Sequence, residues 1–226
     1  MSKAQVFEQF AEVARVLGQA NRLELLEHVA QGERPVERLA QLTGLSLANA
    51  SQHLQVLRRA GFVRAHRDGK QVLYRLGEGP VVPLLAALRR YAEHSRAELN
   101  AIVADYFHRL DSLEPVSRKE LLRRLKDKSV LVLDVRPEDE FAQGHLPGAL
   151  NIPLAHLGKQ LSKLPKRTQI VAYCRGPYCV LSFEAVAALR AKGFDARRLE
   201  DGFPEWKAAG LPLDRSTPPV KRTGTY

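Results

Sequence analysis

Two kinds of hydrophobic pattern divide this chain into two parts. Up to about residue 110, apolar residues recur at helical spacing, as in AQVFEQFAEVARVL (4–17). From residue 118 on, helical stretches alternate with short apolar runs rich in β-branched residues, VLVLDV (130–135) and TQIVAYC (168–174). Continuous runs of this kind are typical of strands that are buried on both faces of a parallel sheet. The sequence therefore predicts a mainly α first domain and an α/β second domain.

The domain boundaries follow from the same patterns. We expect the first domain at 1–110 and a linker at 111–117, where DSLEPVS interrupts the helical pattern. The α/β domain is expected at 118–214, and its first helix begins at the capping-box pattern of Ser117 and Glu120. The tail, 215–226, is rich in Pro, Thr and basic residues, and we expect it to be disordered.

The sequence predicts a cytoplasmic protein without a membrane partner. No apolar run approaches the length of a membrane span. The first ten residues, MSKAQVFEQF, contain no apolar core of a secretory signal. The formal net charge of +10 permits a nucleic-acid partner, but the excess of Lys and Arg is spread over both domains and locates no binding face.

The first domain has the layout of a winged helix-turn-helix. A shorter predicted helix (35–44) and a longer one (46–61) are joined by the turn TGLS. The alternating run 62–76 follows, with Asp68-Gly69 at its centre, which is a strong hairpin signal. In such a layout one helix enters the major groove of DNA and the hairpin, or wing, reaches the flanking backbone. A long amphipathic helix is expected from Pro80 to residue 110.

Polar side chains of the second helix and of the wing are expected to contact DNA. The helix should bury an apolar face formed by Leu47, Ala50, Leu54 and Leu57. Its other faces offer short hydrogen-bonding groups for base edges, and the wing offers cations for phosphates. The predicted DNA-binding residues are Ser46, Asn49, Ser51, Gln52, His53, Gln55, Arg58, Arg64, Arg67 and Lys70.

Three motifs of this domain resemble the ArsR family of bacterial winged-helix repressors, over about residues 5–110. They are NRLELL (21–26), L-S-x-x-x-x-S-x-H-L-x-x-L-x-x-A-G (45–61) and R-x-G-x-x-x-x-Y-x-L (67–76). The resemblance implies a homodimer that binds duplex operator DNA and that forms through the first and last helices of the domain.

The same resemblance raises the question of a metal site. Many family members sense metals through Cys residues near the helix at 35–44, which has none here. A second family site uses His and carboxylates of the last helix, where this chain has Glu93, His94, Glu98, Asp105 and His108. The two His are not spaced as a helical pair, so a solvated helix face is favoured over a site shared across the dimer. We predict no metal and no cofactor.

Both cysteines, Cys174 and Cys179, lie in IVAYCRGPYCVLS (170–182). Without an export signal they are expected to be thiols rather than a structural disulfide, although a transient bridge across the short loop stays open. A strand, a loop and then a helix place Cys174 above backbone N–H groups, where a thiolate and an anion are favoured, and Arg175 adds positive charge. A thiolate beside an anion site can attack a sulfane sulfur while the leaving anion is stabilised.

The second domain resembles the rhodanese domain over about residues 114–214. The motifs are DVR with E-F-x-x-G-H-L-P-G-A-x-N-I-P (134–153) and G-F-x-x-W-x-x-A-G-x-P (202–212). The resemblance implies that Cys174 is the catalytic, persulfide-forming cysteine and that thiosulfate, polysulfide or a persulfide is the sulfur donor. It also implies framework roles for Asp134, Arg136, Glu140 and His145.

The cysteine loop departs from the usual rhodanese pattern C-x-x-G-x-R-S. It is one residue longer up to Ser182 and lacks the Arg, which argues against fast thiosulfate turnover. Phosphatases and arsenate reductases of this fold need an Arg where this chain has Val180, so phosphatase activity is not expected. Cys179 is a candidate resolving thiol. The expected anion-binding loop consists of Arg175, Gly176, Pro177, Tyr178 and Val180.

The favoured hypothesis is a repressor-type transcriptional regulator in which sulfur on Cys174 is coupled to operator binding. Two alternatives stay open. One is a sulfurtransferase that the first domain tethers to DNA. The other is a sensor of arsenite or another soft metal at Cys174 and Cys179, which is one ligand short of a comfortable site.

Overall fold

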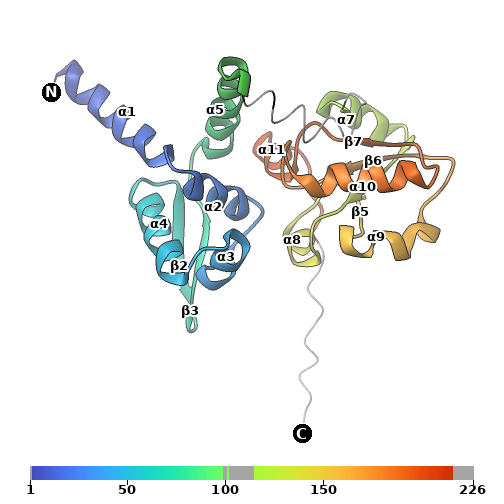
Figure 1. The fold of residues 1–226 in the computed structure, drawn as a ribbon, viewed down its shortest axis with the longest axis horizontal. Coiled ribbons are helices and arrows are strands. Elements are labelled where there is room, and N and C mark those ends of the chain that lie inside the picture. Colours follow the sequence, from blue (N-terminus) through green and yellow to red (C-terminus); the bar gives the residue numbers. More distant parts are fainter. Residues whose placement is uncertain (1, 99–100, 102–114, 216–226) are drawn as a thin grey trace, which may run out of the picture. The chain divides into compact units, whose positions relative to one another are not determined.

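Two units make up the chain in the computed structural model, Met1–Ala86 and Ala87–Tyr226. The structure describes residues 2–98, 101 and 115–215 (Figure 1). The division between the units falls within helix α5 (Val81–Ser95), whereas the sequence pattern predicts a linker at 111–117. Most of that linker, and the tail from residue 216 on, lie outside the described residues.

The first unit is mainly helical, as predicted. Its helices are α1 (Lys3–Leu17), α2 (Ala20–Ala30), α3 (Val36–Thr43), α4 (Leu47–Arg59) and the beginning of α5. Helix α3 ends at Gly44, whose φ of 65° lies in the left-handed region that glycine adopts without strain. The Ser46 hydroxyl then accepts a hydrogen bond from the Asn49 N–H and caps α4. These local signals produce the turn between the two helices.

The wing is the antiparallel hairpin of β2 (Val63–Asp68) and β3 (Gln71–Leu76). Asp68 pairs with Gln71, so Gly69 and Lys70 form the two-residue turn, one position later than predicted. A short strand, β1 (Arg34–Pro35), adds to β3 and gives the order β1-β3-β2. A strand of two residues leaves no periodic signal, so the sequence pattern does not predict it.

Helix α4 packs on the core of the first unit through Ala50, Leu54 and Leu57, which are fully buried as predicted. The prediction that Leu47 is buried on the same face is wrong, because Leu47 is 51% exposed. It lies in the first turn of α4 and at the edge of the apolar stripe, so the neighbouring helices do not cover it.

The predicted helix from Pro80 to residue 110 is shorter in the structure. Helix α5 ends at Ser95, and Arg96 is not helical. Residues 97, 98 and 101 are helical again, and the remainder of the predicted helix lies outside the described residues.

The second unit alternates helices and strands around a sheet. Its elements are α7 (Arg118–Lys126), β4 (Val130–Asp134), α8 (Glu138–Gln143), β5 (Leu150–Asn151), α9 (Leu154–Gln160), a 3₁₀ turn (Leu161–Lys163), β6 (Gln169–Tyr173), α10 (Val180–Ala191), β7 (Ala196–Arg198) and α11 (Phe203–Ala208). The four strands are parallel in the order β5-β4-β6-β7. This confirms the predicted α/β fold with a parallel sheet.

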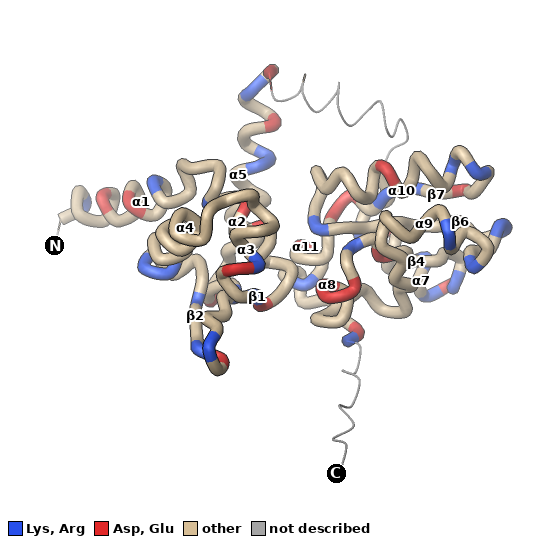
Figure 2. The backbone as a smooth tube through the Cα atoms, turned by 60° about the horizontal axis from the view of Figure 1, so that its bottom comes forward, with Lys and Arg blue, Asp and Glu red and all other residues tan. Residues whose placement is uncertain are grey.

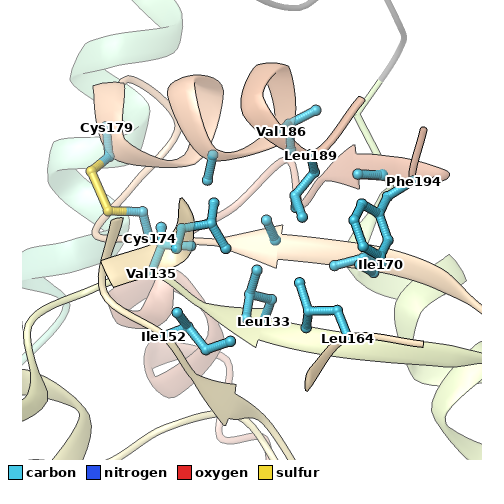
Figure 3. Packing of buried hydrophobic residues seen from close by; sticks show 14 residues of the cluster. Leu133, Val135, Ile152, Leu164, Ile170, Cys174, Cys179, Val186, Leu189 and Phe194 are labelled. Carbon is cyan, nitrogen blue, oxygen red and sulfur yellow. A yellow bond between two sulfur atoms is a disulfide. The ribbon is translucent and has the colours of Figure 1, made fainter. Parts of the chain in front are cut away.

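Alternating residues of the strands enter two separate cores. Leu133, Ile170 and Ala172 pack in one core with residues of α9 and α10, and Figure 3 shows Leu133 and Ile170 in this core. The residues before or after them, such as Val132 and Val171, face α7 and α11 in the other. Because both faces of the sheet are covered, the strands read as continuous apolar runs rather than as alternating ones.

Lys and Arg positions are spread over both units, including the tip of the wing (Figure 2). In the part of the chain that the structure describes, none of the helices combines the length and the apolar character needed to cross a membrane.

Candidate functional sites

Cys174 and Cys179 are joined across a four-residue loop. Cys174 follows the last residue of β6, and Cys179 directly precedes α10. Their Cα atoms are 6.1 Å apart, within the usual range for a disulfide, and their sulfur atoms are bonded (Figure 3). Both side chains are buried. The expectation of two free thiols is therefore not met in this state, because the short loop returns the chain to within bonding distance.

Arg175 forms an ion pair with Glu140. Its Nε and Nη2 atoms lie 3.0 Å and 2.7 Å from Glu140 Oε1, and the Glu140 side chain is almost completely buried. A buried carboxylate without a cationic partner would be costly, and the long Arg side chain reaches it from the loop. The positive charge that Arg175 was expected to add to an anion site is thus neutralised by a carboxylate.

Backbone groups of the loop are also engaged. The Cys179 N–H donates to the Gly176 carbonyl at 3.1 Å, and Arg198 Nη1 donates to the Pro177 carbonyl at 3.4 Å. Val180 begins α10. The loop therefore closes as a turn onto α10, and the Cys179 N–H, one of the donors expected for an anion, is used within the loop.

Tyr178 points its hydroxyl group towards the last turns of α5, within the second unit. The hydroxyl donates a hydrogen bond to the Glu93 carboxylate. Burial raises the pKa of Tyr178 above its ordinary value, and Glu93 raises it further. Arg89, one turn before Glu93, also pairs with Glu205 of α11 at 3.3 Å. Tyr178 is thus a neutral donor that connects the cysteine loop with α5.

Asp134 and Arg136 form a completely buried ion pair at the end of β4, with Nη2 and Oδ2 2.6 Å apart. The Arg136 backbone N–H also donates to Asp134, and the Tyr173 hydroxyl donates to the same carboxylate. Burial lowers the pKa of Arg136, but the charge and hydrogen bond of Asp134, together with Tyr173 and Glu140, outweigh it and the pKa is raised overall. Burial, and then the Asp134 charge, raise the pKa of Tyr173 well above its ordinary value. The hydrogen bond between Tyr173 and Asp134 thus holds the ends of β4 and β6 together.

His145 belongs to a different corner of the second unit. Its ring stacks on Phe141 with 3.6 Å between the ring centres, and its Nδ1 atom lies 3.0 Å from the Phe141 carbonyl oxygen. Its backbone pairs with Asp214. These contacts tie the chain after α8 to the end of the described second unit.

The start of α11 supports the cysteine loop from the other side, and none of its residues is among the predicted site residues. The Phe203 N–H donates to the Cys174 carbonyl at 3.0 Å. A Cβ atom at Gly202 would lie 2.4 Å from the Arg175 carbonyl carbon. The glycine of the motif at 202–212 is a sequence signal for this close approach, since only glycine permits it.

The predicted DNA-binding residues gather on α4 and the wing. Exposed residues include Asn49, Gln52, Gln55, Arg58, Arg67 and Lys70, whereas Ser51 and His53 are half-buried. The exposed Ser46 uses its hydroxyl group as the cap of α4. Arg64 is exposed and forms an ion pair with Glu78 at 2.8 Å, so its charge is partly neutralised. The structure therefore places the polar set on one helix and one hairpin, as the layout requires.

The described residues contain no group of three or more His, Cys, Asp or Glu that could hold a metal ion. Of the last-helix residues considered for metal, Glu93 contacts Tyr178 and Arg89. Asp105 and His108 lie outside the described residues.

Comparison with known proteins agrees with both halves of this description. Residues 117–209 match the rhodanese-like domain family, and residues 17–66 match a helix-turn-helix domain family. The HTH-type transcriptional regulator Rv0324 of Mycobacterium tuberculosis is 41% identical over 216 residues, which are 96% of this chain and 95% of that protein. The chain belongs to the HTH-type transcriptional regulators with a C-terminal rhodanese-like domain.

Other relatives of this regulator match one half each. A sulfurtransferase of Allochromatium vinosum is 34% identical over 100 residues, which are 43% of the regulator and 92% of that protein. A solved structure, described as a homodimeric winged helix-turn-helix DNA-binding domain of Mycobacterium bovis, is 36% identical. The match covers 43% of the regulator and 93% of the chain in that structure, with a TM-score of 0.40.

We predict that Gly202→Ala destabilises the rhodanese-like unit by about 1–3 kcal/mol, the usual cost of overpacking, because the new Cβ atom overlaps the loop backbone. Unfolding in denaturant, followed by the fluorescence of Trp206, measures this. Trp206 is the single tryptophan of the chain and is fully buried in this unit.

Gly158→Ala is the matched control. Gly158 lies inside α9, where an added methyl group would meet no other atom within 4 Å, and alanine favours a helix over glycine by about 0.5–1 kcal/mol. The denaturation midpoint of this variant should stay or rise. Equal midpoints for both variants would show that Gly202 does not support the loop.

Proposed function

We propose that this regulator binds duplex operator DNA as a homodimer in the cytoplasm, and that sulfane sulfur accepted at Cys174 changes its affinity for the operator. The observation that carries the proposal is the cysteine pair: two buried sulfur atoms within bonding distance, at the carboxyl end of a parallel strand and at the start of a helix. In the reduced protein this position keeps the two thiols next to each other.

Helix α4 and the wing support DNA binding. The helix fits a major groove, and the hairpin offers cations to the flanking backbone. Helix α1 supports the homodimer, because it presents an apolar row that the single chain leaves exposed. The row consists of Val6, Phe7, Phe10 and Val13, and Phe10 is 63% exposed. An apolar row of this kind marks an interaction site, and a second copy of the chain would bury it.

The proposed sulfur chemistry begins with the reduced pair. The Cys174 thiolate attacks the outer sulfur of thiosulfate, a new S–S bond forms, and sulfite leaves with the electron pair of the broken bond. The Cys179 thiolate then attacks Cys174 Sγ. A disulfide forms and the persulfide sulfur leaves as hydrosulfide, so the disulfide state of the loop is the product of this step.

The pairing of Arg175 with Glu140 favours sensing over rapid turnover. A turnover enzyme needs cationic or N–H groups aimed at the leaving anion. In this loop the Arg175 guanidinium is paired with Glu140, and the Cys179 N–H is bonded to the Gly176 carbonyl. The alternative, a sulfurtransferase tethered to DNA, gains support from the sulfurtransferase relative. Steady-state sulfur transfer to cyanide, measured beside operator binding, distinguishes the two.

First, removing Arg64, Arg67 and Lys70 together should weaken operator binding and flatten its dependence on salt, because each phosphate contact adds about 0.9 to the slope of log affinity against log salt. Fluorescence anisotropy with a footprinted operator at several salt concentrations measures both. Unchanged binding of the triple variant would rule out a role for the wing.

Second, thiosulfate or polysulfide should add about 32 Da, one sulfur atom, to Cys174 of the reduced protein. Mass spectrometry of the intact protein and its peptides locates the addition. Cys174→Ser should accept no sulfur, whereas Cys179→Ala should retain the persulfide because no second thiol displaces it. Sulfur transfer by Cys174→Ser at the rate of the natural protein would refute the assignment.

Third, the reduced and sulfur-treated forms should differ roughly 5- to 150-fold in operator affinity, the range for a coupling of about 1–3 kcal/mol. Cys179→Ala should lose most of this difference, since it cannot close the loop. Tyr178→Phe should also reduce it, because the hydrogen bond to Glu93 joins the loop to α5. Tyr91→Phe is the control: Tyr91 lies on the same helix and is 70% exposed. Equal affinity of both forms would show that the domains are merely tethered.

A further inference from the structure

A cavity of about 370 Å³ lies between α4 and the wing of the first unit. Its polar side chains include Ser51, Gln55 and Arg58 from α4 and Arg67 from β2, with Val72 and Tyr74 of β3 as apolar walls. The cavity thus lies between the two elements that read DNA in the proposed function.

The α4 side chains reach this cavity together because of their spacing. Ser51, Gln55 and Arg58 are separated by four and then three residues, which places them on one face of the helix. Adjacent to it, the buried face of Ala50 and Leu54 packs on the core. One face of α4 therefore lines the cavity, and the adjacent face packs on the core.

Arg67 reaches the cavity because of the register of the hairpin. Arg67 pairs with Val72 and Ala65 pairs with Tyr74, and cross-strand partners and alternate residues share one face of a sheet. Tyr74 is buried against the core, so this is the inner face of the wing. Arg67 therefore extends over the same space as Arg58.

The outer face of the wing is chemically different. Arg64 and Arg75 pair across the strands there, and Arg64 binds Glu78 at 2.8 Å. His66 alternates onto this face, also borders the cavity, and lies 3.3 Å from Glu33. Carboxylates thus accompany the basic side chains of the outer face, whereas no carboxylate is among the residues that line the cavity.

Two guanidinium groups, a hydroxyl and an amide are the donors that proteins use for a phosphate. We infer that this cavity holds one phosphodiester group of the DNA backbone, bound by Arg58 and Arg67 together. The inference rests on the proposed binding of DNA. A phosphate fixed between the helix and the wing would set the register in which α4 meets the base edges, as backbone contacts do in general.

The volume also suits a small free anion, since ligand sites begin at about 300 Å³. Inorganic phosphate has the same recognition chemistry as a phosphodiester. The two sources differ in one respect: only the DNA phosphate contributes to the salt dependence of operator binding.

The test compares Arg58→Gln and Arg67→Gln with Arg59→Gln and Arg75→Gln. The controls have the same charge change on the same helix and the same hairpin, but Arg59 and Arg75 do not line the cavity. Each cavity variant should reduce the steepness with which log affinity for the operator falls with log salt, by about 0.9 for each phosphate contact that is lost. A dimer has two such cavities, so the expected reduction is about 1.8. The controls should retain the slope of the natural protein.

A second arm identifies the phosphate itself. Operator duplexes with a single neutral methylphosphonate are scanned position by position. Substitution at one position should weaken operator binding by the natural protein and by Arg59→Gln. The same substitution should have little further effect on binding by the double variant Arg58→Gln/Arg67→Gln, because that variant no longer binds this phosphate. Such non-additivity is the sign of a direct interaction.

Three results would overturn the inference. Cavity variants that keep the slope of the controls would do so, and so would methylphosphonate effects that add fully in the double variant. Calorimetric binding of inorganic phosphate that needs Arg58 and Arg67, with an unchanged DNA slope, would assign the cavity to a free anion instead. Failure of the natural protein to bind any operator is a separate outcome and refutes the proposed function as well.

Discussion

The buried ion pair of Asp134 and Arg136 is the interaction on which the second unit depends. Two charges removed from water are tolerable only when their remaining hydrogen-bonding groups are satisfied. Here Tyr173 donates to the carboxylate, Arg136 donates to the Gly144 carbonyl, and the guanidinium lies over the Phe203 ring. The pair therefore joins β4, β6, the end of α8 and the start of α11 at the edge where the cysteine loop begins. Removal of one partner would leave a buried charge, at a cost of about 3–5 kcal/mol.

Two further contacts hold the cysteine loop next to the ion pair of Asp134 and Arg136. Glu140 binds Arg175, and the Phe203 N–H binds the Cys174 carbonyl. The Cys174 carbonyl and the Arg175 side chain are thus held by neighbours, while the two sulfur atoms remain next to each other. An arrangement with a fixed backbone and a reactive pair suits a change of state at sulfur more than repeated release of an anion, in keeping with the proposed sensing role.

Local signals in the sequence predicted most of the fold. Ser46 as a helix cap, the turn beside Gly69 and the runs that form β4 and β6 depend on neighbours within a few residues, so they are readable from the chain. The partners of long charged side chains are not. Arg175 and Glu140, like Arg64 and Glu78, meet only after distant elements pack, and their pairing changes the expected charge of both candidate sites. The prediction for Leu47 is wrong for a related reason. Periodicity shows which face of a helix is apolar, but not how far along the helix the neighbouring elements bury that face.

The pairing of distant segments in the second unit has a consequence for biosynthesis. Strand β7 and the bridge of Val116 to Leu199 close the sheet, and the start of α11 contacts the backbone of the cysteine loop. The wing, by contrast, is a local hairpin completed at Leu76. Domains emerge from the ribosome N-terminal end first, and local contacts form faster than distant ones. The DNA-reading half can therefore become native while Cys174 and Cys179 still lack their cover. For that interval the nascent chain displays two uncovered thiols, and the interval ends when the strands and α10 close the apolar core in which both sulfur atoms lie.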